Sequence, residues 1–140
     1  MRATAWTLAM LWMVGILYTS SLGQAVTPVV GVVQTLVSKL GHVVEYAILG
    51  GLLAVAVRQE VPASWPLMRA LLIATLIGLS FAAFDELRQS FVPGREPRFT
   101  DVLLDLASVL AGAAGVLWLS REERPGSAEE VSSSPGRGLA

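Results

Sequence analysis

The chain contains no cysteine and few charges. The absence of cysteine from its 140 residues excludes disulfides, thiolate metal sites and cysteine nucleophiles. Only 15% of the residues are charged and 54% are hydrophobic, whereas a soluble domain carries about 25% charged residues. The formal net charge of −1 offers no basic field for nucleic acid. The composition therefore favours an integral membrane protein.

Four apolar runs make up most of the sequence, at residues 4–22, 40–57, 67–84 and 102–119. Each is close to the roughly 20 residues that a helix needs to cross the hydrocarbon of a bilayer. They predict an all-α fold, an integral membrane bundle of four transmembrane helices forming one domain over residues 1–119. The first run, preceded by Arg2 and followed by small residues, also fits a signal peptide. We favour an uncleaved helix, because the run is long for the apolar part of a leader.

Two segments outside these runs have a character of their own. Residues 28–39 begin at Pro28 and place apolar residues at helical spacing, which predicts a short amphipathic helix lying in the membrane interface. The alternative is that they simply extend the second span. Residues 120–140 are rich in Ser, Gly, Pro and Glu, so they cannot bury a core and are predicted to form a disordered polar tail.

The positive charges predict an orientation. With four spans and a cytoplasmic N-terminus, six of the ten lysines and arginines lie on the cytoplasmic side. This excess places both termini in the cytoplasm under the positive-inside rule. The other four, which would lie outside, are Lys39, Arg88, Arg95 and Arg98.

The densest polar segment is residues 84–105, FDELRQSFVPGREPRFTDVLLD. Charges at membrane depth are costly, so by default they mark a functional site. In an up-down bundle, the end of the third span and the start of the fourth meet the start of the second at one face of the membrane. Adjacent Asp85 and Glu86 point about 100° apart on a helix, so at least one of them should face inward. A Pro-Gly turn at Pro93 and Gly94 would aim Arg95 back at the helices, and we expect Arg95 to pair with an acid of the third or fourth span.

Three helical stripes carry polar residues toward this shared face. Each stripe joins positions that lie on one side of a helix, and small residues within two of them would allow close helix contact. Plainer explanations stay open: His42 can be a hydrogen-bonded packing residue and Asp101 a helix cap. The nearby arginines, which lie outside the stripes, can form a solvated loop. The stripes are Lys39, His42 and Tyr46; Thr75, Gly78, Ala82, Asp85 and Gln89; and Asp101, Asp105, Ser108, Gly112 and Gly115.

These motifs resemble those of the VanZ-like membrane proteins. The resemblance rests on K-x-x-H-x-x-x-Y at Lys39, D-E-x-x-Q-x-F-x-P-G-R at Asp85, and D-x-x-x-D at Asp101, and it covers roughly residues 40–119. It implies a small helical bundle in the cytoplasmic membrane of a bacterium, in a family named after a protein linked to teicoplanin resistance. Ser108 stands where family members often have Gly, and Asp105 where they have Asn or Asp. The resemblance supports the site and leaves the reaction open.

Three functions fit the polar face. The first is an enzyme or binder for an anionic or glycan-bearing envelope lipid, in which Asp85 or Glu86 serves as general acid or base with His42 as its partner. The others are a non-catalytic interaction or scaffold protein and a small transporter. We expect no cofactor and no metal, although His42, Glu45 and Asp85 could hold one, since one histidine with hard carboxylates favours no particular ion. The expected catalytic residues are His42, Asp85, Glu86 and Asp101, and the expected substrate-binding residues are Lys39, Tyr46, Gln89, Arg95 and Asp105.

Overall fold

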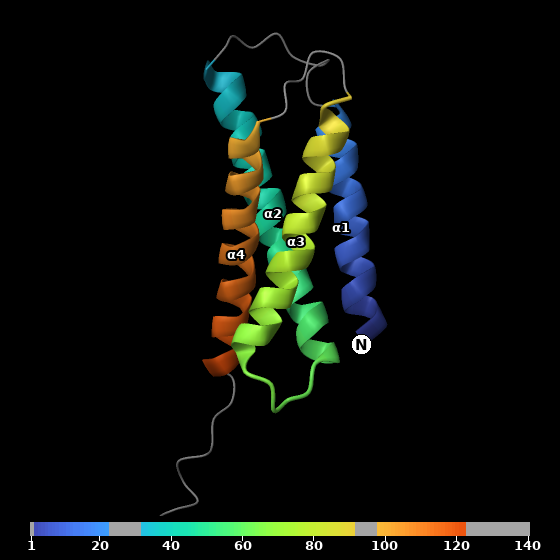
Figure 1. The fold of residues 1–140 in the computed structure, drawn as a ribbon, viewed down its shortest axis with the longest axis vertical. Coiled ribbons are helices and arrows are strands. Elements are labelled where there is room, and N and C mark those ends of the chain that lie inside the picture. Colours follow the sequence, from blue (N-terminus) through green and yellow to red (C-terminus); the bar gives the residue numbers. More distant parts are fainter. Residues whose placement is uncertain (1, 23–31, 92–97, 123–140) are drawn as a thin grey trace, which may run out of the picture.

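The structure, a computed structural model, describes residues 2–22, 32–91 and 98–122. Its elements are α1 (Arg2–Leu22), α2 (Val32–Glu60), α3 (Leu67–Gln89) and α4 (Phe99–Glu122). The helices run up and down side by side, so that the end of α1, the start of α2, the end of α3 and the start of α4 lie together (Figure 1). The predicted all-α bundle of four helices is confirmed.

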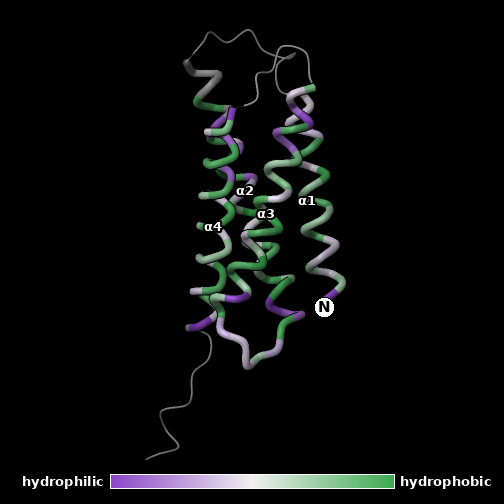
Figure 2. Tube along the Cα trace, viewed as in Figure 1, coloured by the Kyte–Doolittle hydropathy of each residue, from purple (hydrophilic) through white to green (hydrophobic). Residues whose placement is uncertain are grey.

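All four helices are long and apolar enough to cross a membrane. Large apolar side chains point outward from each of them, for example Leu11 on α1, Leu40 on α2, Leu76 on α3 and Leu110 on α4. Such a surface fits lipid, not water. The apolar middle of the bundle lies between more hydrophilic ends (Figure 2). The chain therefore fits a multi-pass membrane protein.

Glycine allows α2 and α4 to pack closely. A Cβ atom added at Gly50 would collide with the carbonyl group of Val109, and one added at Gly112 would collide with that of Ala47. Removing side chains at such crossings lets helix backbones approach each other in a membrane. By contrast, Gly115 is exposed and has open space around it. The predicted inward stripe of α4 therefore holds as far as Gly112 and is wrong at Gly115, because a helix of 3.6 residues per turn drifts away from a 3.5-residue repeat.

On α3, the predicted small-to-polar stripe forms the buried face from Gly78 onward, whereas Thr75 is only partly buried and Ala74 takes its place on that face. Buried residues recur through the helix in the order Ala70, Ala74, Gly78, Ala82, Asp85 and Gln89. This spacing is that of one helix face. The stripe directs two polar side chains into the bundle at the end where α1 finishes.

The ends of the helices differ from those expected. From Val32 onward, the segment predicted as an interfacial helix is continuous with α2, which was the alternative to a separate helix. Residues 28–31 lie outside the described residues. α4 continues to Glu122, two residues past the predicted start of the tail at 120, and residues 123–140 again lie outside the described part of the chain.

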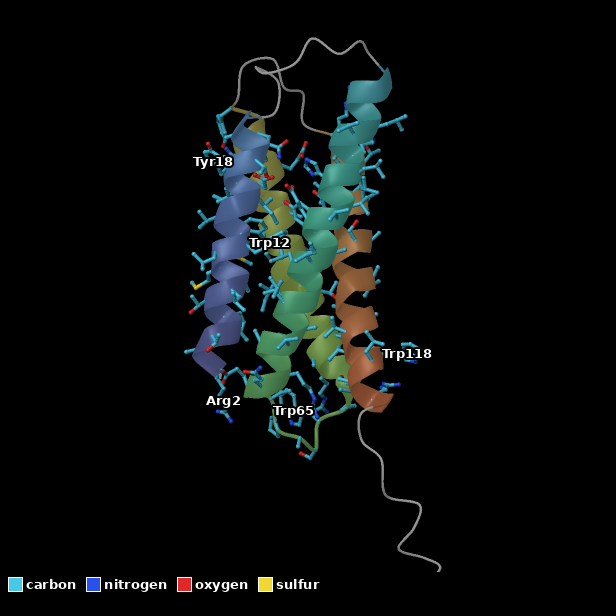
Figure 3. The ribbon with its side chains drawn as sticks, turned by 180° about the vertical axis from the view of Figure 1, so that it is seen from behind. Arg2, Trp12, Tyr18, Trp65 and Trp118 are labelled. Carbon is cyan, nitrogen blue, oxygen red and sulfur yellow. The ribbon has the colours of Figure 1, made fainter. Side chains whose placement is uncertain are left out.

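The opposite end of the bundle carries simpler polar contacts. There the Arg69 guanidinium lies 4.9 Å from the centroid of the Trp65 ring, and Arg2 is 3.9 Å from Glu60. Trp65, Trp118 and Arg2 mark this end (Figure 3). Tryptophan and arginine at one level are typical of a membrane interface.

Candidate functional site

All four helices contribute polar side chains to one end of the bundle. Hydrophilic positions gather there on α1, α2, α3 and α4 (Figure 2). Figure 3 shows side-chain oxygen and nitrogen atoms between the helices at this end, at about the level of Tyr18. We call this region the polar end.

Asp85 is the most strongly held carboxylate of the polar end, with 1% of the residue exposed. Its Oδ1 accepts hydrogen bonds from Arg88 Nη2 at 2.9 Å and Nε at 3.2 Å. Its Oδ2 accepts one from Gln89 Nε2 at 2.7 Å. Positions three and four residues apart lie on one side of a helix, so α3 itself supplies this cradle. The pairing neutralises a charge that would otherwise be costly to bury.

Helix α1 completes the cradle. Ser20 Oγ donates to Asp85 Oδ1 at 2.9 Å, and Arg88 Nη1 donates to Ser21 Oγ at 2.8 Å. Arg88 also donates to the Ser20 hydroxyl. We did not predict a contribution from α1. The signal was present as the adjacent hydroxyl residues Ser20 and Ser21 at the end of an apolar run. Of these, Ser21 was interpreted only as a small residue of the alternative signal peptide.

A second polar link joins α1 to α2 through Glu45. Thr19 Oγ1 donates to Glu45 Oε1 at 3.0 Å. About two turns further along α1, toward the middle of the bundle, Trp12 Nε1 donates to the backbone carbonyl of Glu45 at 2.8 Å, and Figure 3 shows Trp12 on α1 toward the interior of the bundle. These bonds place α1 against the start of α2.

His42 pairs with Asp105, which is 2% exposed. The His42 Nδ1 atom lies 3.3 Å from Asp105 Oδ1 and 3.5 Å from Oδ2. An ionised carboxylate only accepts hydrogen bonds, so toward an ionised Asp105 the His42 Nδ1 atom is the donor. The acid partner of His42 is thus Asp105. The expectation that Asp85 or Glu86 takes this role is wrong.

Tyr46 lies beneath His42 on α2 and is fully buried. Its ring stacks on that of His42 with centroids 6.0 Å apart and packs against Phe81 at 6.2 Å. The Tyr46 hydroxyl has no hydrogen-bond partner among the described residues. Asp85 acts on this hydroxyl most strongly of the nearby carboxylates, and Asp105 follows, although no described residue is placed at full hydrogen-bond geometry to it.

The outer part of the polar end holds weaker contacts. Lys39 Nζ lies 3.3 Å from Asp101 Oδ1, and both side chains are partly exposed. Asp101 also lies in the first turn of α4, where a helix favours negative charge. Glu86 Oε1 accepts a hydrogen bond from the backbone N–H of Arg98 at 2.6 Å. Of the adjacent acids, Asp85 therefore faces inward and Glu86 lies at the rim.

Eight of the nine predicted site residues lie at the polar end, namely Lys39, His42, Tyr46, Asp85, Glu86, Gln89, Asp101 and Asp105. The ninth, Arg95, lies outside the described residues together with Pro93 and Gly94, so its expected pairing stays a prediction. Within the described ranges, no three His, Asp or Glu side chains are grouped closely enough to hold a metal ion.

Comparison with known proteins gives one match. The model of the family described as VanZ/LLP1 matches residues 4–120, which contain all four spans and the whole polar end. No curated protein matches the chain, and no solved structure does so.

Proposed function

The chain belongs to the VanZ-like (VanZ/LLP1) family, and from this premise we propose that it binds an anionic or glycan-bearing lipid of the bacterial envelope at its polar end, and holds or modifies that lipid there. We place the protein in the cytoplasmic membrane with both termini in the cytoplasm, so that the polar end faces outward. The orientation rests on the excess of positive charge assigned to the cytoplasmic side.

The burial of Asp85 and Asp105 is the observation that carries the proposal. Both carboxylates lie inside a bundle of spanning helices, where ionisable groups are rare and typically mark a pathway or a binding site. A buried ion pair is also a weak source of stability compared with apolar packing of similar volume. Folding alone therefore gives little reason to keep these groups.

The position of the polar end suits a lipid better than a soluble ligand. The outward faces of the helices are apolar along their length, so acyl chains can lie against them. A headgroup at the same leaflet would then reach the level of Lys39 and Arg88. Both cations now pair with carboxylates, and an anionic group of the lipid would compete for these contacts.

The His42–Asp105 pair supports a catalytic version of this function. A carboxylate bonded to Nδ1 holds an imidazole in one orientation and one tautomer. In that arrangement Nε2 can take a proton from a hydroxyl group or return one to a leaving group. Binding without reaction needs the same residues, so an interaction or scaffold protein is the alternative.

Native mass spectrometry of the protein purified from bacterial membranes tests the binding. We expect wild type to retain a lipid whose mass includes a phosphate or a sugar, and Asp105→Asn to lose it. The matched control is Glu60→Gln at the opposite end, which disturbs only the exposed pair with Arg2 and should retain the lipid. Retention by Asp105→Asn, or no lipid on wild type, would contradict the proposal.

A consequence for antibiotic susceptibility follows from the family. Because the family is named after a teicoplanin-resistance protein, we propose that occupancy of the polar end alters glycopeptide susceptibility. Cells that produce Asp105→Asn should then respond to teicoplanin like cells without the protein, and cells that produce Glu60→Gln should respond like wild type.

A further inference from the structure

Two buried groups at the centre of the polar end have unused hydrogen-bonding capacity. The Tyr46 hydroxyl is fully buried without a partner in the described part of the chain, although burying an unpaired hydroxyl costs free energy. Asp105 is nearly fully buried, and among the described residues the one hydrogen-bond donor that it meets, His42 Nδ1, is shared between its two oxygens. A carboxylate can accept about four hydrogen bonds, so Asp105 retains spare acceptor capacity.

These two groups belong to one place. The Tyr46 ring stacks on that of His42 with centroids 6.0 Å apart, and His42 Nδ1 lies 3.3 Å from Asp105 Oδ1. Asp85 and, less strongly, Asp105 act electrostatically on the Tyr46 hydroxyl. The unpaired donor and the unfilled acceptor are therefore neighbours, inside a region that all four helices enclose.

The charge of the polar end disfavours a simple anion. Its described residues carry two more carboxylates than cations. Arg88 is already bonded to Asp85 and Lys39 to Asp101. The carboxylates are Glu45, Asp85, Glu86, Asp101 and Asp105, and the cations are Lys39, Arg88 and Arg98.

We propose that the ligand places a neutral hydroxyl group, as on a sugar headgroup, between Tyr46 and Asp105. A hydroxyl oxygen accepts from the Tyr46 hydroxyl while its own hydrogen is donated to Asp105. A fully ionised phosphate has no hydrogen to donate to Asp105, and an ammonium group cannot accept one from Tyr46. This inference rests on the proposed function. That function names two classes of lipid, anionic and glycan-bearing, and the inference selects the glycan-bearing class.

The conservative variant Tyr46→Phe separates this role from a structural one. It removes only an unpaired hydroxyl, so the ligand-free protein should be as stable as wild type or slightly more stable. Thr75→Val is the matched control, because Thr75 Oγ1 is also buried without a partner in the described structure. Thr75 lies about 15 Å from Asp85 along α3, at 1.5 Å per residue.

The experiment measures the melting temperature of the protein in nanodiscs of phosphatidylcholine alone or with one added lipid. The three additions are monoglucosyldiacylglycerol, phosphatidic acid and phosphatidylethanolamine. We expect the glucolipid to raise the melting temperature most, and we expect Tyr46→Phe to weaken its apparent affinity about tenfold or more, the equivalent of one hydrogen bond. Asp105→Asn should weaken it as well, whereas Thr75→Val should bind like wild type.

The outcomes distinguish this inference from the proposed function. A larger shift with phosphatidic acid or phosphatidylethanolamine than with the glucolipid overturns the hydroxyl ligand while lipid binding stands. An unchanged affinity of Tyr46→Phe for the glucolipid also overturns the hydroxyl ligand. In that case a buried water molecule is the partner of the Tyr46 hydroxyl. If no added lipid shifts wild type and none is retained from native membranes, both proposals fail.

Discussion

Replacing Arg88 with alanine leaves the Asp85 carboxylate without its cation inside the polar end of the bundle. Asp85 is almost fully buried, whereas 28% of the Arg88 side chain is exposed. Removing one partner of a buried pair costs roughly 3–5 kcal/mol, because the remaining charge is stranded. Ser20 and Gln89 still donate to Asp85, so we expect a loss near the lower end, about 3 kcal/mol.

Lys39→Ala is the matched control for this prediction. Its pair with Asp101 has a similar N–O separation, 3.3 Å against 2.9 Å, but 42% of the Lys39 side chain is exposed. Exposed pairs contribute about 0–1 kcal/mol. The free energies of unfolding can be compared in mixed micelles by titrating a denaturing detergent and following circular dichroism.

The double variant Asp85→Asn with Arg88→Ala tests whether the two residues are coupled. Once the carboxylate is neutral, the loss of Arg88 strands no charge, so the double variant should be more stable than Arg88→Ala alone. Equal losses for Arg88→Ala and Lys39→Ala, or simply additive effects in the double variant, would refute the reasoning.

Three further predictions concern the fold and its orientation. Gly50→Ala should lose about 1–3 kcal/mol of unfolding free energy in the same titration, because the added methyl group meets a backbone carbonyl of α4. Gly115→Ala is its control and should stay within about 0.5 kcal/mol of wild type, because Gly115 has open space around it. Trp12→Phe should lose about 1 kcal/mol with its bond to α2; an unchanged midpoint would contradict this. In the cysteine-free chain, a membrane-impermeant thiol reagent added to intact cells should label Ser90→Cys and not Ser132→Cys, and the reverse pattern would invert the proposed orientation.

The fold was predictable because its determinants are local. Each apolar run of spanning length became one helix, and the small-to-polar order on α3 is the buried face. The exact ends were less accessible: α3 continues to Gln89 and α4 begins at Phe99, since polar residues at the membrane interface can extend a helix without lengthening its apolar run. Gly115 departs from its stripe because helix drift accumulates over several turns.

The gathering of the site was predictable, but its pairings were not. Helical stripes predicted that Asp85, Gln89 and Asp105 would share one end of the bundle. They did not indicate that His42 would pair with Asp105, because this choice depends on the relative rotation of α2 and α4. The link between Asp85 and Arg88 was within reach of sequence reasoning, since the residues are three apart on one helix. The hydrogen bonds from Ser20 to Asp85 and from Arg88 to Ser21 could be identified only in the tertiary structure, because they join α1 to α3.

The central claim is that the buried charges of the polar end serve a ligand more than the fold. The variant Asp85→Leu with Arg88→Met tests it most directly, because apolar replacement of both members of a buried pair is often neutral or stabilising. Two quantities are measured on the same purified variant: its melting temperature, and the lipid that it retains in native mass spectrometry. We predict a melting temperature at or above that of wild type and no retained lipid. A stable variant that retains the wild-type lipid would contradict the claim, and so would a variant that unfolds because the pair is needed for the fold.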